Sequence, residues 1–300
     1  MGRCMRFCII RGFIVTAAKT CGILYVVATP IGNLEDLSTR ARQILNEVDV
    51  IAAEDTRHTG KLLQTIGCNT PSISLHEHNE QQRTAEMLMR LHAGSSIALV
   101  SDAGTPLISD PGFNLVRELV SHGVRVIPIP GACAAIAALS VAGLPTDRFV
   151  FEGFLPAKTS KRKEHLNSLN HETRTMVFYE VPHRIAETLS DLMQVFGGSR
   201  NAAVCRELTK LYETSYYGTL TELNDRAATD ADLSRGEIVI VVAGCDAQEE
   251  IATTLAAEQV LAVLLKELPA SKAAKLAAQI CNADRAQLYE LAVKRKGAVD

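Results

Sequence analysis

The sequence predicts an α/β protein with two α/β domains and a small C-terminal helical domain. Between residues 23 and 129, short apolar runs rich in Val and Ile alternate with segments of helical periodicity, which is typical of a mostly parallel sheet with helices on both faces. After residue 148 the apolar runs are longer, and three of the five are predicted to be joined by connections too short for a helix, which favours antiparallel pairing. From Gly244 onwards the pattern is helical.

The elements of the first half follow in regular order. Asn79 is expected to cap a helix and Pro111 to lie in the first turn of another, while Gly94 and Gly123 follow helix ends. The predicted strands cover 23–29, 48–53, 72–75, 96–101 and 124–129, and the predicted helices cover 37–48, 58–67, 79–94 and 111–123.

An alanine-rich stretch with several Pro and Gly residues, 128–149, interrupts this rhythm and predicts a domain boundary near Gly131. The second half contains predicted strands at 148–154, 174–181, 201–208, 214–220 and 236–244. The predicted domains are therefore an N-terminal extension at 1–22, α/β domains at 23–130 and 131–248, and a helical tail at 249–300.

Composition restricts the class of protein. The chain has 300 residues, of which 47% are hydrophobic and 22% charged, as in globular proteins. Its net charge of -3 gives no overall indication of nucleic-acid binding, so any such surface must be local. Eight cysteines without a CxxC pair favour a reducing cytoplasm over disulfides or a metal site. Arg11 interrupts the apolar part of the first 22 residues, which argues against a signal peptide.

Polar or glycine-bearing loops follow all five strands of the first half. The longest is VSDAGTPLISDPG, residues 100–112, with two acids and several turn-forming pairs. Ligands in parallel sheets bind beyond the carboxyl ends of the strands, so these loops predict a ligand site. Simple structural roles are also open: Thr56 could cap a helix, and Asp110 with Ser109 could cap the helix starting at Pro111.

Common nucleotide and hydrolase motifs are missing from these loops. The first strand is not followed by GxGxxG, and neither GxxxxGK[ST] nor GxSxG occurs in the chain. His76 and His78 could suggest a metal ion, but non-metal roles are favoured, and we expect no metal.

Several longer motifs resemble the ribosomal RNA small subunit methyltransferase I family, in collinear order from about Ile23 to Gly244. The motifs are VATPIGNLEDLSTRA, AAEDTRHTGKLL, SLHEHNE, ALVSDAGTPLISDPG, PIPG, GLPTDRFVFEGFLP, FYEVPHR and RELTKLYE. The resemblance implies the tetrapyrrole-methylase-like fold, with S-adenosylmethionine bound in a cleft between two α/β domains, a homodimer, and methylation of a cytidine 2′-hydroxyl in small-subunit ribosomal RNA.

The resemblance also implies which residues bind the methyl donor. Loop 100–112 would lie against the methionine part, and the loops after the first and fifth strands would frame the rest. The family pattern Gly-Pro-Ser after the fifth strand is replaced here by Gly131-Ala132-Cys133, so donor affinity or loop order is expected to differ. The implied cofactor-binding residues are Thr29, Pro30, Gly32, Asn33, Asp102, Ala103, Gly104, Thr105, Pro130, Gly131 and Ala132.

Methyl transfer to a ribose hydroxyl requires positioning and benefits from a base or a cation near the oxygen. We favour Glu54 or Asp55 as the acid pair and Arg57 as a clamp for phosphate or carboxylate, because its planar fork suits either group. The histidines are further candidates: His58, His76 and His78.

Local positive charge predicts where RNA binds. Residues 251–300 carry seven basic and five acidic residues, a surplus of +2 in a chain whose total is -3. A solvated helical face is the alternative for any one lysine. The predicted RNA-binding residues are Lys158, Lys161, Arg162, Lys163, Lys294, Arg295 and Lys296.

Two other functions are compatible with these patterns. One is a tetrapyrrole methyltransferase with the same fold and donor, although its first loop would be glycine-rich and TPIGNLED is not. The other is a non-catalytic ribosome assembly factor, which would not bind the donor.

Overall fold

The computed structural model describes residues 21–76, 79–245, 247–281 and 283–296, without the side chains of 247–255 and 295–296. The predicted extension at 1–22 therefore lies almost entirely outside the described residues. The chain folds into two compact units. The first extends to Ala137 and includes Glu207–Glu213; the second comprises Ala138–Arg206 and the chain from Thr214 onwards. The predicted limits at 130 and 248 stay predictions.

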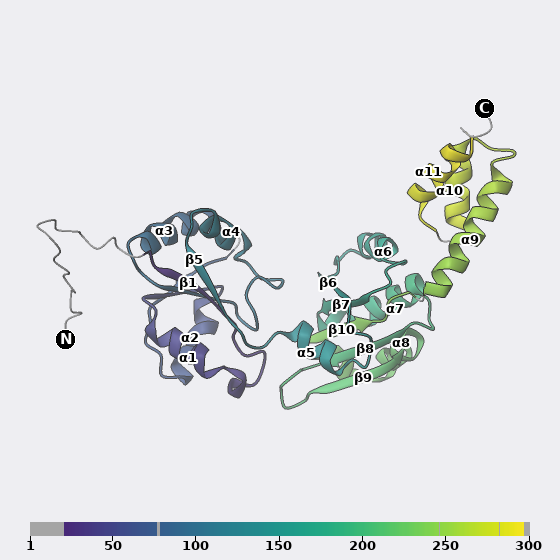
Figure 1. The fold of residues 1–300 in the computed structure, drawn as a ribbon. Helices are drawn as coiled ribbons and strands as arrows, with labels where there is room; N and C mark the ends of the chain where they lie inside the picture. The colour runs from purple at the N-terminus through teal and green to yellow at the C-terminus, as the bar shows by residue number, and fades with distance from the viewer. Residues whose placement is uncertain (1–20, 77–78, 246, 282, 297–300) are drawn as a thin grey trace, which may run out of the picture. The chain divides into compact units, whose positions relative to one another are not determined.

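The first unit is a five-stranded parallel sheet with the order β3-β2-β4-β1-β5. Figure 1 shows α1 and α2 on one face and α3 and α4 on the other, which confirms the predicted layers. The strands are β1 (Ile23–Val27), β2 (Val50–Ala53), β3 (Ser72–Ser74), β4 (Ile97–Val100) and β5 (Arg125–Ile129). The helices are η1 (Leu34–Asp36), α1 (Thr39–Glu47), α2 (Thr56–Thr65), α3 (Glu80–His92) and α4 (Phe113–Ser121).

Two apolar clusters, one on each face, hold this sheet. Leu45 and Leu63 pack with Ile51 in one cluster, and Met87 and Leu115 belong to the other. All four residues of β2 and of β4 are buried, as expected for central strands covered on both faces.

Three predicted helix caps differ from the structure. Asp55, and not Thr56, caps α2, because its carboxylate accepts a hydrogen bond from the Arg57 backbone N–H. Helix α4 begins at Phe113 after Gly112, so neither Asp110 nor Ser109 caps it. Asn79 precedes α3 without a side-chain bond to that helix.

The first turn of α4 is satisfied by a residue from α3. The buried Glu80 carboxylate accepts hydrogen bonds from the Leu115 backbone N–H (3.1 Å) and the Asn114 side-chain amide (3.0 Å). A carboxylate at a helix N-terminus is favoured by the helix dipole. As predicted, Gly94 follows the end of α3 and Gly123 follows the end of α4. Their φ angles are 94° and 72°.

The second unit contains a sheet with the order β6-β7-β10-β8-β9. Strands β6 and β7 are parallel, and the other three pairs are antiparallel, so the predicted antiparallel pairing is confirmed. Its strands are β6 (Phe149–Phe154), β7 (Thr175–Glu180), β8 (Asn201–Arg206), β9 (Thr214–Thr219) and β10 (Ile238–Val242).

The connections of this sheet differ from the prediction, because helices interrupt all but the β8–β9 connection. Antiparallel pairing arises instead because β10 lies between β7 and β8. The helices are α5 (Ala134–Val141), which spans the division between the units, α6 (Thr159–Ser168), η2 (Pro182–Arg184), α7 (Ile185–Phe196), α8 (Leu220–Thr229) and η3 (Ala231–Ser234).

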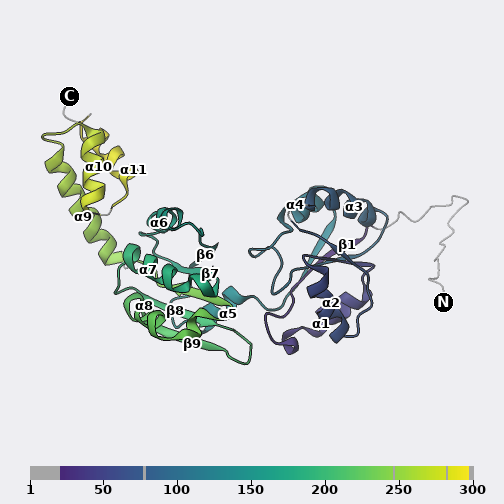
Figure 2. The ribbon, with the colours of Figure 1, turned by 180° about the vertical axis from the view of Figure 1, so that it is seen from behind.

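The predicted helical tail is confirmed. Figures 1 and 2 show α9 (Ala247–Leu264), α10 (Ala270–Cys281) and α11 (Arg285–Lys296) beside one another. Small buried side chains such as Ala274 and Ala277 pack against Leu261 and Leu288 and let the helices approach closely. Within the part of the chain that the structure describes, no helix combines the length and apolar character needed to cross a bilayer.

Candidate functional site

The loop after β4 lies at the centre of a row of loops in the first unit. All five strands are parallel, so their carboxyl ends meet at one edge of the sheet. Because β4 lies between β2 and β1, residues 100–112 have the loops after those two strands as neighbours. Ligands of open parallel sheets bind at such positions.

The loop after β4 is bonded to the loop after β1. The Thr29 backbone N–H donates to the Gly104 carbonyl (2.8 Å), and the Gly104 N–H donates back to the Thr29 carbonyl (3.1 Å). Thr29 is buried, and its hydroxyl donates to the Ser101 carbonyl (3.3 Å). Gly104 has φ of 83°, and a Cβ there would lie 3.2 Å from Ile31. This crossing therefore requires glycine.

Two further hydrogen bonds join the same loop to its other neighbours. The Asp55 backbone N–H, after β2, donates to the Asp102 carboxylate (3.1 Å). The Thr105 hydroxyl donates to the carbonyl of Ala132, after β5 (2.9 Å). Residues predicted to bind the methyl donor, from the loops after β1, β4 and β5, are thus brought together.

Two carboxylates of the β4 loop influence each other. Partial burial raises the pKa of Asp110, the Ser101 hydroxyl opposes this by hydrogen bonding, and the negative charge of Asp102 raises it further. In the same loop, Leu107 and Ser109 have φ of 74° and 67°, which non-glycine residues adopt only when the surroundings hold them. A cationic group would relieve the repulsion between the two acids.

The loop after β2 places an ion pair at the start of α2. The Asp55 carboxylate accepts hydrogen bonds from Arg57 Nη2 (2.7 Å) and Nε (3.1 Å). These bonds hold the pKa of Asp55 well below its usual range and raise the pKa of Arg57. A carboxylate with such a low pKa is a poor base. The adjacent Glu54, which follows β2, is half-buried.

The candidate histidines lie at different places, one of them outside the described residues. His58 is exposed in α2. His76 is exposed after the edge strand β3, with Asn79 Nδ2 3.2 Å from its Nε2. His78 lies outside the described residues. Among the residues that the structure describes, no group of three or more His, Cys, Asp or Glu side chains could hold a metal ion.

A segment that carried no role in the sequence prediction also contributes. Glu207–Glu213, between β8 and β9, belongs to the first unit. The Asn33 backbone N–H donates to the Thr209 hydroxyl (3.2 Å), and a Cβ at Gly32 would collide with the Lys210 side chain. The only signal for this segment in the sequence was the family motif RELTKLYE. No local pattern indicates that this motif contacts TPIGN.

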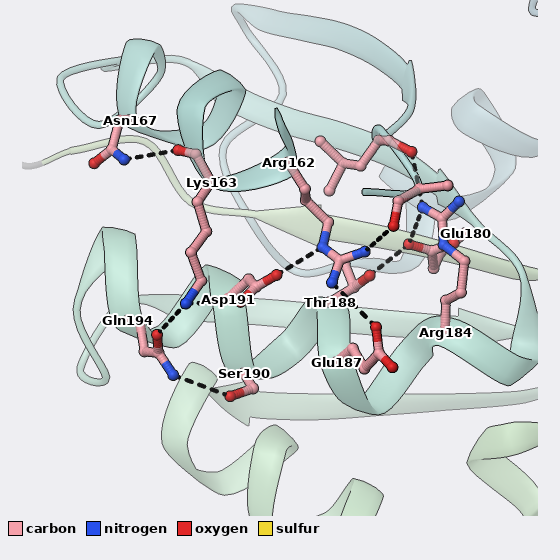
Figure 3. Close-up of polar contacts among 12 residues, drawn as sticks. Arg162, Lys163, Asn167, Glu180, Arg184, Glu187, Thr188, Ser190, Asp191 and Gln194 are labelled. Atoms are coloured by element: carbon pink, nitrogen blue, oxygen red, sulfur yellow. Dashed lines mark hydrogen bonds and ion pairs between the residues drawn. The ribbon is translucent and has the colours of Figure 1, made fainter. Parts of the chain in front are cut away.

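Arg162 does not lie where the RNA-binding prediction requires. Its side chain is fully buried, and its Nε donates to Asp191 (2.7 Å) while Nη2 pairs with Glu187 (3.3 Å) (Figure 3). A guanidinium enclosed in this way cannot reach an RNA phosphate, so the prediction for Arg162 is wrong. The residue instead joins α6 to α7.

The other predicted RNA-binding side chains are placed differently. Lys158 and Lys161 are exposed at the start of α6, whereas Lys163 is held by Gln194 (2.7 Å) and Asp191 (3.3 Å). Lys294 is exposed on α11. The side chains of Arg295 and Lys296 lie outside the described ones.

The parallel sheet with a bonded row of loops, the mixed second sheet and the helical tail define a two-sheet α/β protein with an additional C-terminal helical domain. Residues 23–224 match the family model of Tetrapyrrole (Corrin/Porphyrin) Methylases, and residues 251–296 match the RsmI C-terminal HTH domain. The chain belongs to the ribosomal RNA small subunit methyltransferase I family. The predicted family, fold class and methyltransferase activity are confirmed.

Curated relatives and solved structures support this at different levels. The chain is 53% identical to a ribosomal RNA small subunit methyltransferase I from Pseudomonas aeruginosa, over 92% of this chain and 98% of the relative. It is 50% identical to one from Escherichia coli O157:H7, over 94% and 98%.

Two solved structures show the same fold. A cobalt precorrin-4 methyltransferase has a TM-score of 0.56 at 17% identity, covering 74% of this chain and 94% of that one. Uroporphyrin-III C-methyltransferase from Thermus thermophilus, complexed with S-adenyl homocysteine, has a TM-score of 0.51 at 18% identity, with 74% and 97% covered. At these identities, the likeness concerns the fold alone.

Proposed function

We propose that the chain transfers a methyl group from S-adenosylmethionine to the 2′-hydroxyl of a cytidine in small-subunit ribosomal RNA. The observation that carries this proposal is the set of hydrogen bonds that Asp102, Gly104 and Thr105 make to three neighbouring loops. Relatives named for ribosomal RNA small subunit methylation, at 50% identity and more, supply the substrate class. We also propose that the chain acts in the cytoplasm and forms a homodimer.

The residues of these loops fit the methyl donor. S-adenosylmethionine supplies an electrophilic methyl group on a positively charged sulfur, and a cation is favoured beside Asp102 and Asp110. Gly131 approaches the segment that follows β1 so closely that a Cβ would lie 2.9 Å from the Ala28 Cβ. Thr29, Pro30, Gly32 and Asn33 on one side, and Pro130, Gly131 and Ala132 on the other, would hold the donor together with Asp102, Ala103, Gly104 and Thr105.

The chain's own groups then orient the acceptor and receive its proton. Glu54 would take the proton of the ribose hydroxyl. Asp55 suits this role less well, because its hydrogen bonds with Arg57 lower its pKa and therefore its affinity for a proton. The exposed guanidinium of Arg57 would still present donors to an RNA phosphate. His76 would take the proton if Glu54 does not.

Mapping 2′-O-methylation tests the function directly. Small-subunit ribosomal RNA from cells with and without the gene should differ at a cytidine, and purified protein should restore the mark with S-adenosylmethionine. Labelling of a precorrin-type substrate and not of ribosomal RNA would identify a tetrapyrrole methyltransferase. Absence of donor binding in calorimetry would identify an assembly factor.

Replacing Asp102 by Ala should weaken S-adenosylmethionine binding by about 1–3 kcal/mol, or about 5- to 150-fold, the scale for loss of a hydrogen bond involving a charged group. Calorimetry measures this. The Asp102→Asn variant keeps an acceptor for the Asp55 N–H and separates loss of charge from loss of loop structure. Asp225→Ala removes an exposed carboxylate on α8 as a control. Unchanged affinity in folded Asp102→Ala protein would remove Asp102 from the donor site.

Truncation after about Gly244 should leave donor binding intact and weaken RNA binding. Residues 251–300 carry the surplus of +2, and each lost phosphate contact lowers the slope of log affinity against log salt by about 0.7–0.9. Binding of small-subunit RNA at several salt concentrations compares the truncated chain with the full chain. An identical slope would mean that the tail contributes no phosphate contact.

A further inference from the structure

A polar pocket in the second unit takes no part in the proposed donor site. It has a volume of about 530 Å3 and lies where β6, β7 and β8 begin and β10 ends. The register brings these ends together, because Phe149 is beside Thr175 and Val242 is beside both Met176 and Ala202. All of its lining residues belong to the second unit.

Three arginines line this pocket, and Asp147 is the one acid among its lining residues. Arg174 is fixed by Glu172, which accepts from its Nε (2.8 Å) and Nη2 (2.6 Å). These hydrogen bonds lower the pKa of Glu172 to about 2, so the pair stays ionised. Arg174 is therefore a rigid part of the wall whose charge is already balanced.

Arg200 presents a buried donor that lacks an acceptor. Its guanidinium lies 5.1 Å from the centre of the Phe196 ring, and Nη2 donates to the Asn170 carbonyl (3.4 Å). Its Nη1 is buried and has no hydrogen-bond acceptor among the described residues. An unsatisfied buried donor costs about 1–3 kcal/mol, and more when charged. The positive charge of this guanidinium would attract an anion into the pocket.

Arg148 adds a positive charge that is not held in an ion pair with any described residue. Its side chain is exposed, and no described Asp or Glu lies within ion-pair distance of it. The Thr175 backbone N–H donates to its carbonyl (3.3 Å) and fixes the backbone at the start of β6. The three arginines of the lining outnumber its one acid, Asp147, together with Glu172, which pairs with Arg174, so the lining carries a positive surplus.

The frame of the pocket is held by backbone contacts. Gly244 lies so close to the Thr173 carbonyl that a Cβ would collide with it. The Cys245 N–H donates to the Glu172 carbonyl (2.7 Å), and the Ala243 N–H donates to the Asn201 carbonyl (2.9 Å). Arginine donors in a fixed frame need little reorganisation to bind an anion.

We propose that this pocket binds a phosphodiester group of the RNA acceptor. The planar guanidinium matches a phosphate with two parallel hydrogen bonds, which an ammonium does not. The inference rests on the proposed RNA substrate, which carries one such group per nucleotide. Phosphate contacts of this kind fix the register of an RNA on a protein without reading its sequence. The pocket would thus position the acceptor through the second unit.

The experiment compares full-length Arg148→Ala with Arg235→Ala, which removes the same charge from an exposed site paired only with Asp232 (3.6 Å) among the described residues. Binding of transcribed small-subunit ribosomal RNA is measured at several salt concentrations. Arg148→Ala should bind several-fold more weakly, with the salt slope lower by about 0.7–0.9 for one phosphate contact. Arg235→Ala should keep the wild-type slope, and both should keep the donor affinity. Arg200→Gln, which retains a long side chain without the charge, should behave as Arg148→Ala.

Two outcomes would overturn the inference. One is an unchanged salt slope in both pocket variants. The other is loss of inorganic phosphate binding in the variants with unchanged RNA binding, which would define a site for small anions. Wild-type methylation of the RNA, measured in parallel, keeps the two proposals separate. If wild-type protein methylates the RNA and the variants match it in slope, the pocket inference alone fails; if wild-type protein neither binds nor methylates RNA, the proposed function fails.

Discussion

Replacing Glu54 by Gln is expected to lower the methyl-transfer rate by about 10²- to 10⁴-fold, the range for loss of a positioned general base. Gln keeps the size and hydrogen-bonding capacity of the side chain but cannot accept the ribose proton. Donor and RNA affinities should hold, so the loss should fall on kcat. Single-turnover transfer of labelled methyl to small-subunit RNA measures the effect.

The neighbouring carboxylate is the sharpest comparison for Glu54. Asp55→Asn retains a good helix cap, so α2 should persist, but it releases Arg57 from a charged partner. Its activity should fall less than that of Glu54→Gln, since a carboxylate with a strongly lowered pKa takes up a proton poorly. Glu47→Gln, an exposed change at the end of α1, controls for loss of one charge. Full activity of Glu54→Gln would move the role of base to His76.

The Arg162→Ala variant is expected to be destabilised by about 3–5 kcal/mol, because the buried Asp191 would lose its enclosed partner and keep only the partly exposed Lys163 (3.3 Å). The Asp191 side chain is only 6% exposed, and that of Arg162 is fully enclosed. A change of this size should lower the midpoint of thermal unfolding by about 10 °C. Lys161→Ala, one residue earlier and exposed, should change the midpoint by no more than about 1–2 °C.

A double replacement and an RNA measurement complete this test. Arg162→Met combined with Asp191→Leu removes both charges and should recover most of the stability, since an apolar pair of similar volume can replace a buried ion pair. At a temperature where the double variant is folded, its salt slope for RNA binding should equal that of the wild type. A midpoint within about 1–2 °C of wild type for Arg162→Ala, or a reduced slope, would contradict the structural role of Arg162.

The sequence alone determined the elements of both sheets and the edge at which the loops gather. Buried strands show as short Val- and Ile-rich runs because burial imposes a local pattern, and parallel strands place all their following loops at one edge. The motifs around Asp102 and Glu54 indicated the family by their resemblance to it. Relatives with about 50% sequence identity confirm this family.

Only the tertiary structure decided which of these polar residues meet and which are buried. A lysine- and arginine-rich run such as KTSKRK has the same composition whether its members face solvent or, as Arg162 does, an acid 29 residues away. Asp102 reaches Asp55 across 47 positions, and Glu80 caps a helix 35 positions later. The order of β10 between β7 and β8, and the gathering of Arg148, Arg174 and Arg200, depend likewise on long-range pairing. Local periodicity fixes an element, but the partner of a polar group depends on which distant segments fold against it.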